Sequence, residues 1–166
     1  MLINIIIQAI GFIAWILLTI SYWQKDTNKI LIFHILSGIF YIIHYYMLDA
    51  TVGLSIIFFE IIRDFAYYKS SLDKLIFRIT IPIYILFGIL SYNGLPSLMP
   101  TLASLIDGYT LTSTKNKIII VGAIISEILW LIYNIYSKSY IGIITELIMI
   151  ISNSIAIKKT ILYKDN

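Results

Sequence analysis

Long apolar runs alternate with short polar stretches along the whole chain. The apolar runs cover residues 2–22, 30–47, 52–68, 75–91, 97–111, 118–136 and 141–157. Most of them approach the ~20 residues that an α-helix needs to cross a ~30 Å hydrocarbon core. The pattern therefore predicts seven transmembrane helices, of which the fifth is short and carries Pro96 and Pro100 at its start.

Composition agrees with a membrane protein. Of the 166 residues, 60% are hydrophobic and only 13% are charged, and the mean hydropathy is +0.92. A water-soluble fold of this length could not bury so much apolar surface. The N-terminal MLINIII lacks the basic region of a secretory signal, so we expect the first segment to remain as a helix.

Several function classes are excluded by what the sequence lacks. Without cysteine there is no disulfide framework, thiol nucleophile or cysteine metal site. The net charge is only +3, and the lysines fall in short loops, which argues against a nucleic-acid surface. No phosphate loop, zinc-protease motif or Ser/His/Asp grouping appears. We expect no enzyme activity, no cofactor and no metal.

Basic residues occupy every second connection between the predicted spans. On one side they are Lys25, Lys29, Lys69, Lys74, Arg78, Lys115, Lys117, Lys158, Lys159 and Lys164; the other side holds only Lys138. Short cytoplasmic loops accumulate lysine and arginine. The alternation predicts an N-terminus outside and a C-terminus in the cytoplasm, and it would fail if one span were absent.

The chain also repeats itself. The stretch KDTNKI at 25–30 has a counterpart, STKNKI, at 113–118, and with an offset of 89 Ser37 meets Ser126 and Gly53 meets Gly142. Polar stripes on spans two and three coincide with those on spans six and seven. We therefore expect a first three-helix repeat at 1–69, a linker helix at 70–95, and a second repeat with a short tail at 96–166. An odd linker helix keeps the two repeats parallel, and solute sites in such folds lie where the repeats face each other.

These features carry a family resemblance. The plan of three, one and three helices is similar to the SWEET, PQ-loop and nicotinamide riboside transporter folds, and SYWQK resembles a divergent PQ-loop opening. More closely, SYWQKDTNKILIFHILSGIFYIIHYYML and FFEIIRDFAYYKS resemble bacterial inner membrane proteins of the YgjV type. The resemblance implies an all-α, SWEET-like protein of the inner membrane. The second repeat has no recognisable PQ pair.

Acidic residues within the predicted spans need a reason, because a charge at mid-bilayer costs roughly 2.5–3.5 kcal/mol on insertion scales. They are Glu60, Asp64, Asp107, Glu127 and Glu146, with Arg63 among them. Glu60 and Arg63, at i and i+3, could form a fixed ion pair. Glu127 has no such partner and is either a hydrogen-bond donor between helices or part of a site for a proton or a cationic solute.

Other residues are candidates for a solute pathway. Tyr41 and Trp130 hold matching positions on spans two and six and could clamp a ring or a cation, or simply pack. His34 is a candidate proton relay or a packing residue. The SWEET resemblance adds Asn153 as a solute ligand and Trp23 and Gln24 as a gate. Gly11 and Pro100 are candidate hinges.

The sequence thus predicts a small-solute transporter or facilitator that works by alternating access, either proton-linked or for a cationic or ring-containing metabolite. Its expected binding residues are Tyr41, Glu60, Asp64, Glu127, Trp130, Asn134, Glu146 and Asn153. The alternative is a scaffold, accessory or sensor protein that uses the same fold without transport. The expected partners are the lipid bilayer and an unidentified solute, and a homo-oligomer is left open.

Overall fold

The computed structural model describes residues 2–22, 27–69, 73–111 and 115–162. These residues form seven α-helices and one 3₁₀ turn, without any strand among them. The elements are α1 (Leu2–Tyr22), α2 (Thr27–Met47), α3 (Thr51–Lys69), α4 (Asp73–Leu90), η1 (Leu95–Leu98), α5 (Met99–Leu111), α6 (Asn116–Tyr136) and α7 (Tyr140–Leu162). Every apolar run of the sequence is a helix, as predicted.

The helix α5 is the shortest, at 13 residues, and the 3₁₀ turn η1 leads directly into it. Pro96 stands at the start of η1 and Pro100 in the first turn of α5. Both positions suit proline, since the first N–H groups of a helix have no acceptor within it. Gly94 precedes η1 with φ of 87°, a conformation that other residues adopt only with strain.

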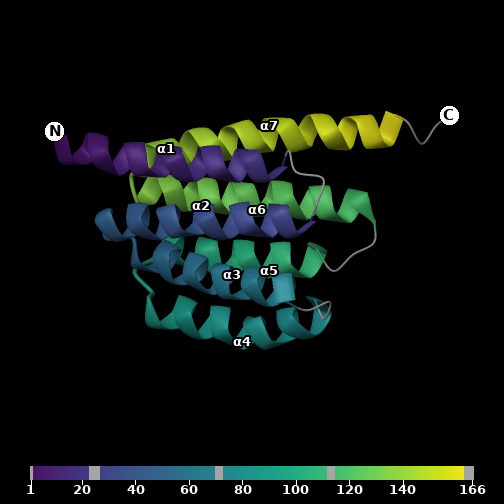
Figure 1. Ribbon diagram of the computed structural model, residues 1–166, viewed down its shortest axis with the longest axis horizontal. Helices are drawn as coiled ribbons and strands as arrows, with labels where there is room; N and C mark the ends of the chain where they lie inside the picture. Colours follow the sequence, from purple (N-terminus) through teal and green to yellow (C-terminus); the bar gives the residue numbers. More distant parts are fainter. Residues whose placement is uncertain (1, 23–26, 70–72, 112–114, 163–166) are drawn as a thin grey trace.

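The helices form two layers of three that lie against each other (Figure 1). In the first layer α2 lies between α1 and α3, and in the second α6 lies between α5 and α7. The layers meet along two edges, α1 against α7 and α3 against α5. The helix α4 closes the bundle at one side, where it packs against both α3 and α5.

Apolar side chains cover the outside of the bundle. Large residues that face outward include Ile5 and Ile16 on α1 and Ile144 and Ile151 on α7, each at least 40% exposed. Three helical segments are long and apolar enough to cross a membrane, namely Ile3–Ser21, Lys117–Tyr136 and Tyr140–Lys158, and Leu31–Met47 and Arg78–Leu90 are shorter apolar segments. With lipid as the solvent, an apolar exterior around a polar interior is the expected distribution.

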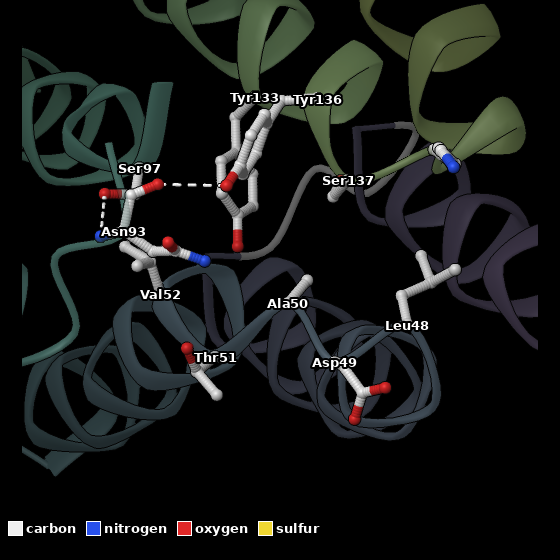
Figure 2. Close-up of a pocket in the computed structure, with 11 residues that line it drawn as sticks. Leu48, Asp49, Ala50, Thr51, Val52, Asn93, Ser97, Tyr133, Tyr136 and Ser137 are labelled. Carbon is white, nitrogen blue, oxygen red and sulfur yellow. Dashed lines mark hydrogen bonds between the residues drawn. The ribbon is translucent and has the colours of Figure 1, made fainter. Parts of the chain in front are cut away.

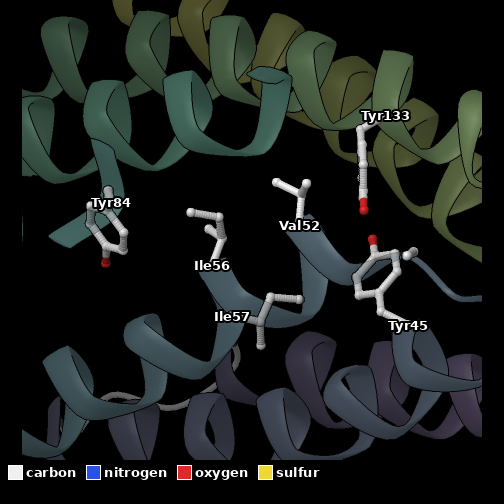
Figure 3. Close-up of a cluster of buried hydrophobic side chains, with 7 residues drawn as sticks. Tyr45, Val52, Ile56, Ile57, Tyr84 and Tyr133 are labelled. Atoms are coloured by element: carbon white, nitrogen blue, oxygen red, sulfur yellow. The ribbon is translucent and has the colours of Figure 1, made fainter. Parts of the chain in front are cut away.

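The interior contains an unusual share of polar groups. A hydrophobic cluster does exist, formed mainly by α3 residues Val52, Ile56 and Ile57 with the rings of Tyr84 and Tyr133 (Figure 3). Nevertheless, among the described residues more polar and charged residues than hydrophobic ones are buried. Polar groups so placed must find partners, because an unpaired buried group costs about 1–3 kcal/mol.

Two turns have the same backbone geometry 89 residues apart. The α2–α3 turn places Asp49 at φ 54°, and the α6–α7 turn places Lys138 at φ 59°. The next amide bonds back across the turn in each, Ala50 N to Tyr45 O at 2.9 Å and Ser139 N to Asn134 O at 2.9 Å. This is the Schellman motif, in which a left-handed residue ends a helix.

The same offset recurs within the helices. Ser37 on α2 donates to the carbonyl oxygen of Ala14 on α1 at 2.8 Å, and Ser126 on α6 donates to that of Ala103 on α5 at 3.1 Å. Both serines are buried and both bonds join the first and second helices of a layer. Ser37 and Ser126, which the offset of 89 matches in the sequence, therefore make equivalent contacts in the two layers.

Candidate functional site

Polar side chains of α2, α6 and α7 form a network between the two layers. Tyr45 Oη donates to Asn134 Oδ1 at 2.6 Å, and Asn134 Nδ2 lies 3.5 Å from Glu146 Oε1. Tyr45 and Asn134 are almost fully buried. Asn134 and Glu146, both predicted as binding residues, are thus brought together, and the network joins one layer to the other.

The two predicted clamp residues both contact Tyr45. The ring of Tyr41 stacks on it at a centroid distance of 6.2 Å, and the ring of Trp130 does so at 6.1 Å. Tyr45 was not among the predicted binding residues. A signal was present, because Tyr45 occupies the position 89 residues before Asn134.

Arg63 pairs with Asp64, its neighbour in α3, and does not form the ion pair with Glu60 that helical spacing allowed. Arg63 Nε and Nη2 each lie 3.0 Å from Asp64 Oδ1, and His34 Nδ1 of α2 lies 3.4 Å from Asp64 Oδ2. Arg63 Nη1 also lies 3.4 Å from the hydroxyl of Tyr84 on α4. Asp64 and His34, predicted as a binding residue and a relay, are parts of one polar cluster, in which Arg63 and Asp64 are buried and His34 is half-buried.

Glu60 lies in the same part of α3 but contacts α5. Its Oε1 accepts a hydrogen bond of 2.6 Å from Ser104 Oγ, and Ser104 is fully buried. This bond joins the two layers at their α3–α5 edge. Glu60 is therefore held by a neutral hydroxyl, and Arg63 is left to Asp64.

Glu127 has one satisfied and one unsatisfied oxygen. Asn153 Nδ2 on α7 donates to its Oε1 at 2.6 Å, whereas its Oε2 is buried without a hydrogen-bond partner among the described residues. The side chain is 8% exposed. Asp107 of α5 and Glu146 of α7 lie near enough to interact with it electrostatically. Glu127 and Asn153, both predicted as binding residues, are thus brought together beside two further carboxyl groups.

The candidate hinges lie at close helix contacts. Gly11 packs against His44 and Ile141, with no room for a side chain, and Pro100 is fully buried. The gate residues Trp23 and Gln24 lie outside the described residues.

His44, which was not among the predicted site residues, links α1 to the α6–α7 turn. Its Nδ1 lies 2.8 Å from Ile7 O, and its Nε2 lies 2.7 Å from Ser139 Oγ. Because a carbonyl oxygen can only accept, Nδ1 carries the proton in this arrangement. The side chain of Gln8 reinforces the link by accepting a hydrogen bond from Ile141 N at 3.1 Å.

A pocket of about 350 Å³ opens at the end of the bundle where the α2–α3 turn, η1 and the α6–α7 turn meet (Figure 2). Asp49, Asn93, Ser97, Tyr133 and Lys138 are among the residues that line it. Tyr133 Oη accepts a hydrogen bond of 2.8 Å from Gly53 N, an amide in the first turn of α3. This bond ties α6 to α3 next to the pocket.

Among the described residues, no group of three or more potential metal ligands comes together. The site instead consists of hydrogen-bonded amides, carboxyl groups and stacked rings. Such groups can bind a small polar solute or exchange protons.

Comparison with known proteins places the chain in a family. The family model Imp-YgjV, described as bacterial inner membrane protein, matches residues 5–164. No curated protein and no solved structure matches the chain. Because the family match covers nearly the whole sequence, the resemblance to YgjV-type proteins is confirmed, and the chain belongs to the Imp-YgjV family of bacterial inner membrane proteins.

Proposed function

We propose that this protein moves a small polar solute across the inner membrane by alternating access between two three-helix repeats, α1–α3 and α5–α7, in a SWEET-like plan with α4 as the linker. The observation that carries the proposal is the polar network between the layers, below a pocket that is open at one end. A membrane protein that only needed to be stable would have little use for buried carboxyl groups there.

Equivalent contacts support a repeat that can rock as a unit. The two Schellman turns and the two serine bonds occur at the same offset of 89. Contacts between the repeats are sparser than those within them, because among the described α-helices only α1 with α7 and α3 with α5 pack closely, and hydrogen bonds such as Tyr45 to Asn134 and Tyr133 to Gly53 join the layers elsewhere. Separation of the repeats at the pocket end would require the hydrogen bonds of Tyr45, Tyr133 and His44 across the layers to break.

Glu127 is our candidate for the proton or cation carrier. Its Oε2 has no hydrogen-bond partner in the described chain, and Asn153 holds the other oxygen in place. A carboxyl group held in this way can accept a proton or bind a cationic group without first losing a protein contact. Tyr41, Trp130, Asn134 and Glu146 would line the solute path. Glu60, Asp64 and His34 would then stabilise the α3 side.

We further propose that the pocket faces the outside. The opposite end of the bundle carries basic residues, namely Lys29, Lys69, Lys115 and Lys158. The positive-inside rule assigns that end to the cytoplasm. The N-terminus would then be outside and the C-terminus inside. Both repeats are present in one chain, so the pathway needs no second copy.

A specific observation favours a second candidate, a scaffold, accessory or sensor protein. Asp64, Glu60 and Asn134 all have protein partners, so part of the interior is already satisfied. In that case the network would fix the packing of the helices and no solute would cross.

Flux through purified protein in liposomes separates the two candidates. Uptake of metabolites from a broad panel is measured for the parent, Glu127→Gln and Trp130→Ala, with Tyr46→Phe as control because Tyr46 is 71% exposed. Transport predicts uptake by the parent and the control, and reduced uptake by the other two. If no member of the panel moves, or all four proteins behave alike, the transport proposal fails and the scaffold is favoured.

A further inference from the structure

The pocket brings together two opposite charges from equivalent turns. Asp49 at the end of α2 and Lys138 at the end of α6 both line it. They are 89 residues apart, and both adopt a left-handed backbone. The lining of one pocket thus includes a residue with a carboxylate from one turn and a residue with an ammonium group from the other.

Neither Asp49 nor Lys138 forms an ion pair with another described residue. Both residues are exposed, so each charge is open to a ligand. An anion entering the pocket would be attracted by Lys138 and repelled by Asp49, and a cation would meet the reverse. A solute that carries both charges gains from both residues.

The remaining lining suits such a solute. The ring of Tyr136 and the ring of Tyr133 border the pocket, and aromatic faces attract ammonium groups. Asn93 and Ser97 add polar groups on the η1 side, although Ser97 Oγ already bonds to Asn93 N at 2.8 Å. A volume of about 350 Å³ is at the small end for ligand pockets, which favours a molecule of amino-acid size.

We propose that this pocket binds a zwitterion, with its ammonium group at Asp49 and its anionic group at Lys138. The same chemistry occurs in a free amino acid and in a phosphatidylethanolamine headgroup. The proposal deepens the proposed function by naming the class of solute. It is tested by binding at equilibrium, so its outcome does not depend on whether any solute crosses the membrane.

The test uses purified full-length protein in detergent, with binding measured by calorimetry. The probes are ω-amino acids of three to six carbons, each compared with the amine and the carboxylic acid of equal length. The expected result is that one or more amino acids bind, and that the singly charged compounds bind at least about tenfold more weakly, the scale of one charge-assisted contact. Equal binding of an amine or an acid would overturn the proposal.

Two variants remove the charges while respecting the backbone. Asparagine tolerates the left-handed conformation, so Asp49→Asn and Lys138→Asn should fold like the parent. Each should weaken binding of the amino acid about tenfold, as one lost charge contact predicts. The double variant Asp49→Lys, Lys138→Asp should recover binding of the amino acid, since a zwitterion can bind in the opposite orientation. Lys115→Asn, at the other end of the bundle, is the matched control and should bind as the parent does.

A lipid arm identifies the source of the zwitterion. The parent and both asparagine variants are placed in nanodiscs of phosphatidylethanolamine or of phosphatidylglycerol, and their thermal stability is compared. A preference of the parent for phosphatidylethanolamine that both variants lose supports the site with a headgroup as its ligand. If neither soluble amino acids nor this lipid show an effect that depends on Asp49 and Lys138, the inference is wrong.

Discussion

The hydrogen bond from Tyr45 to Asn134 should couple the two layers by a measurable free energy. The bond is short, at 2.6 Å, and both side chains are at most 2% exposed. Tyr45→Phe removes the donor and leaves Asn134 Oδ1 without another partner among the described residues. Interhelical hydrogen bonds in membranes average about 0.6 kcal/mol and reach about 1.7 kcal/mol. A short, fully buried bond with no replacement belongs near the upper end.

A double-mutant cycle isolates this bond from other effects. The free energy of unfolding is measured by titration with SDS, followed by far-UV circular dichroism, for the parent, Tyr45→Phe, Asn134→Leu and the double variant. We expect Tyr45→Phe to cost about 1–1.5 kcal/mol in the parent and much less once Asn134 is replaced. Asn134→Leu should cost more, because it also removes the contact with Glu146.

Tyr46→Phe is the control, since Tyr46 is adjacent in sequence but 71% exposed. It should leave the free energy of unfolding unchanged. A coupling energy below ~0.3 kcal/mol, within the scatter of additive sites, would refute the reasoning. The two layers would then be held together by packing, and the hydrogen-bond network would not contribute to the coupling between them.

Three further predictions follow from the repeat and the turns. Ser37→Ala and Ser126→Ala should each lower the free energy of unfolding by about 0.6 kcal/mol in the same SDS titration, and their effects should add, because each removes one equivalent interhelical bond; unequal losses would contradict the equivalence. Lys138→Gly should raise the free energy of unfolding. It removes the strain of a left-handed lysine, about 1–2 kcal/mol, which exceeds the loss of about 0.4–1 kcal/mol from the greater entropy of glycine in the unfolded chain; a loss of stability would refute the strain. Because the chain has no cysteine, Asp49→Cys should react with an impermeant thiol reagent added outside cells and Lys115→Cys should not; the opposite pattern would reverse the proposed orientation.

The sequence predicted the helices well because the bilayer imposes a simple rule on them. Apolar runs of membrane length can only be helices, so the positions of α1 to α7 followed from hydropathy. The offset of 89 was visible as well, since Ser37 and Ser126 are polar residues in an otherwise apolar pattern. The family model matches residues 5–164, a range that includes both serines.

The partners of the polar residues were harder to predict. Helical spacing favoured a bond between Glu60 and Arg63, because residues three or four apart share a face and adjacent residues do not. In the structure Arg63 contacts Asp64, the next residue. A long guanidinium side chain can bend to a neighbour, and Glu60 has a competing hydroxyl from Ser104 across the bundle. Such a choice depends on the packing of other helices, which one helix does not encode.

The left-handed residues connect the fold to the inferred site. A Schellman turn is best served by glycine at its left-handed position, because a side chain there is strained. Aspartate tolerates the conformation, but lysine has no local reason to occupy it. Lys138 nevertheless stands there and lines the same pocket as Asp49. The left-handed backbone at Lys138 costs about 1 kcal/mol, and the turn itself does not require a lysine. The binding of a ligand by the charge of Lys138 explains the residue better than the folding of the turn does. Lys138→Gly should therefore separate the two roles, with a more stable protein that binds the zwitterion less tightly.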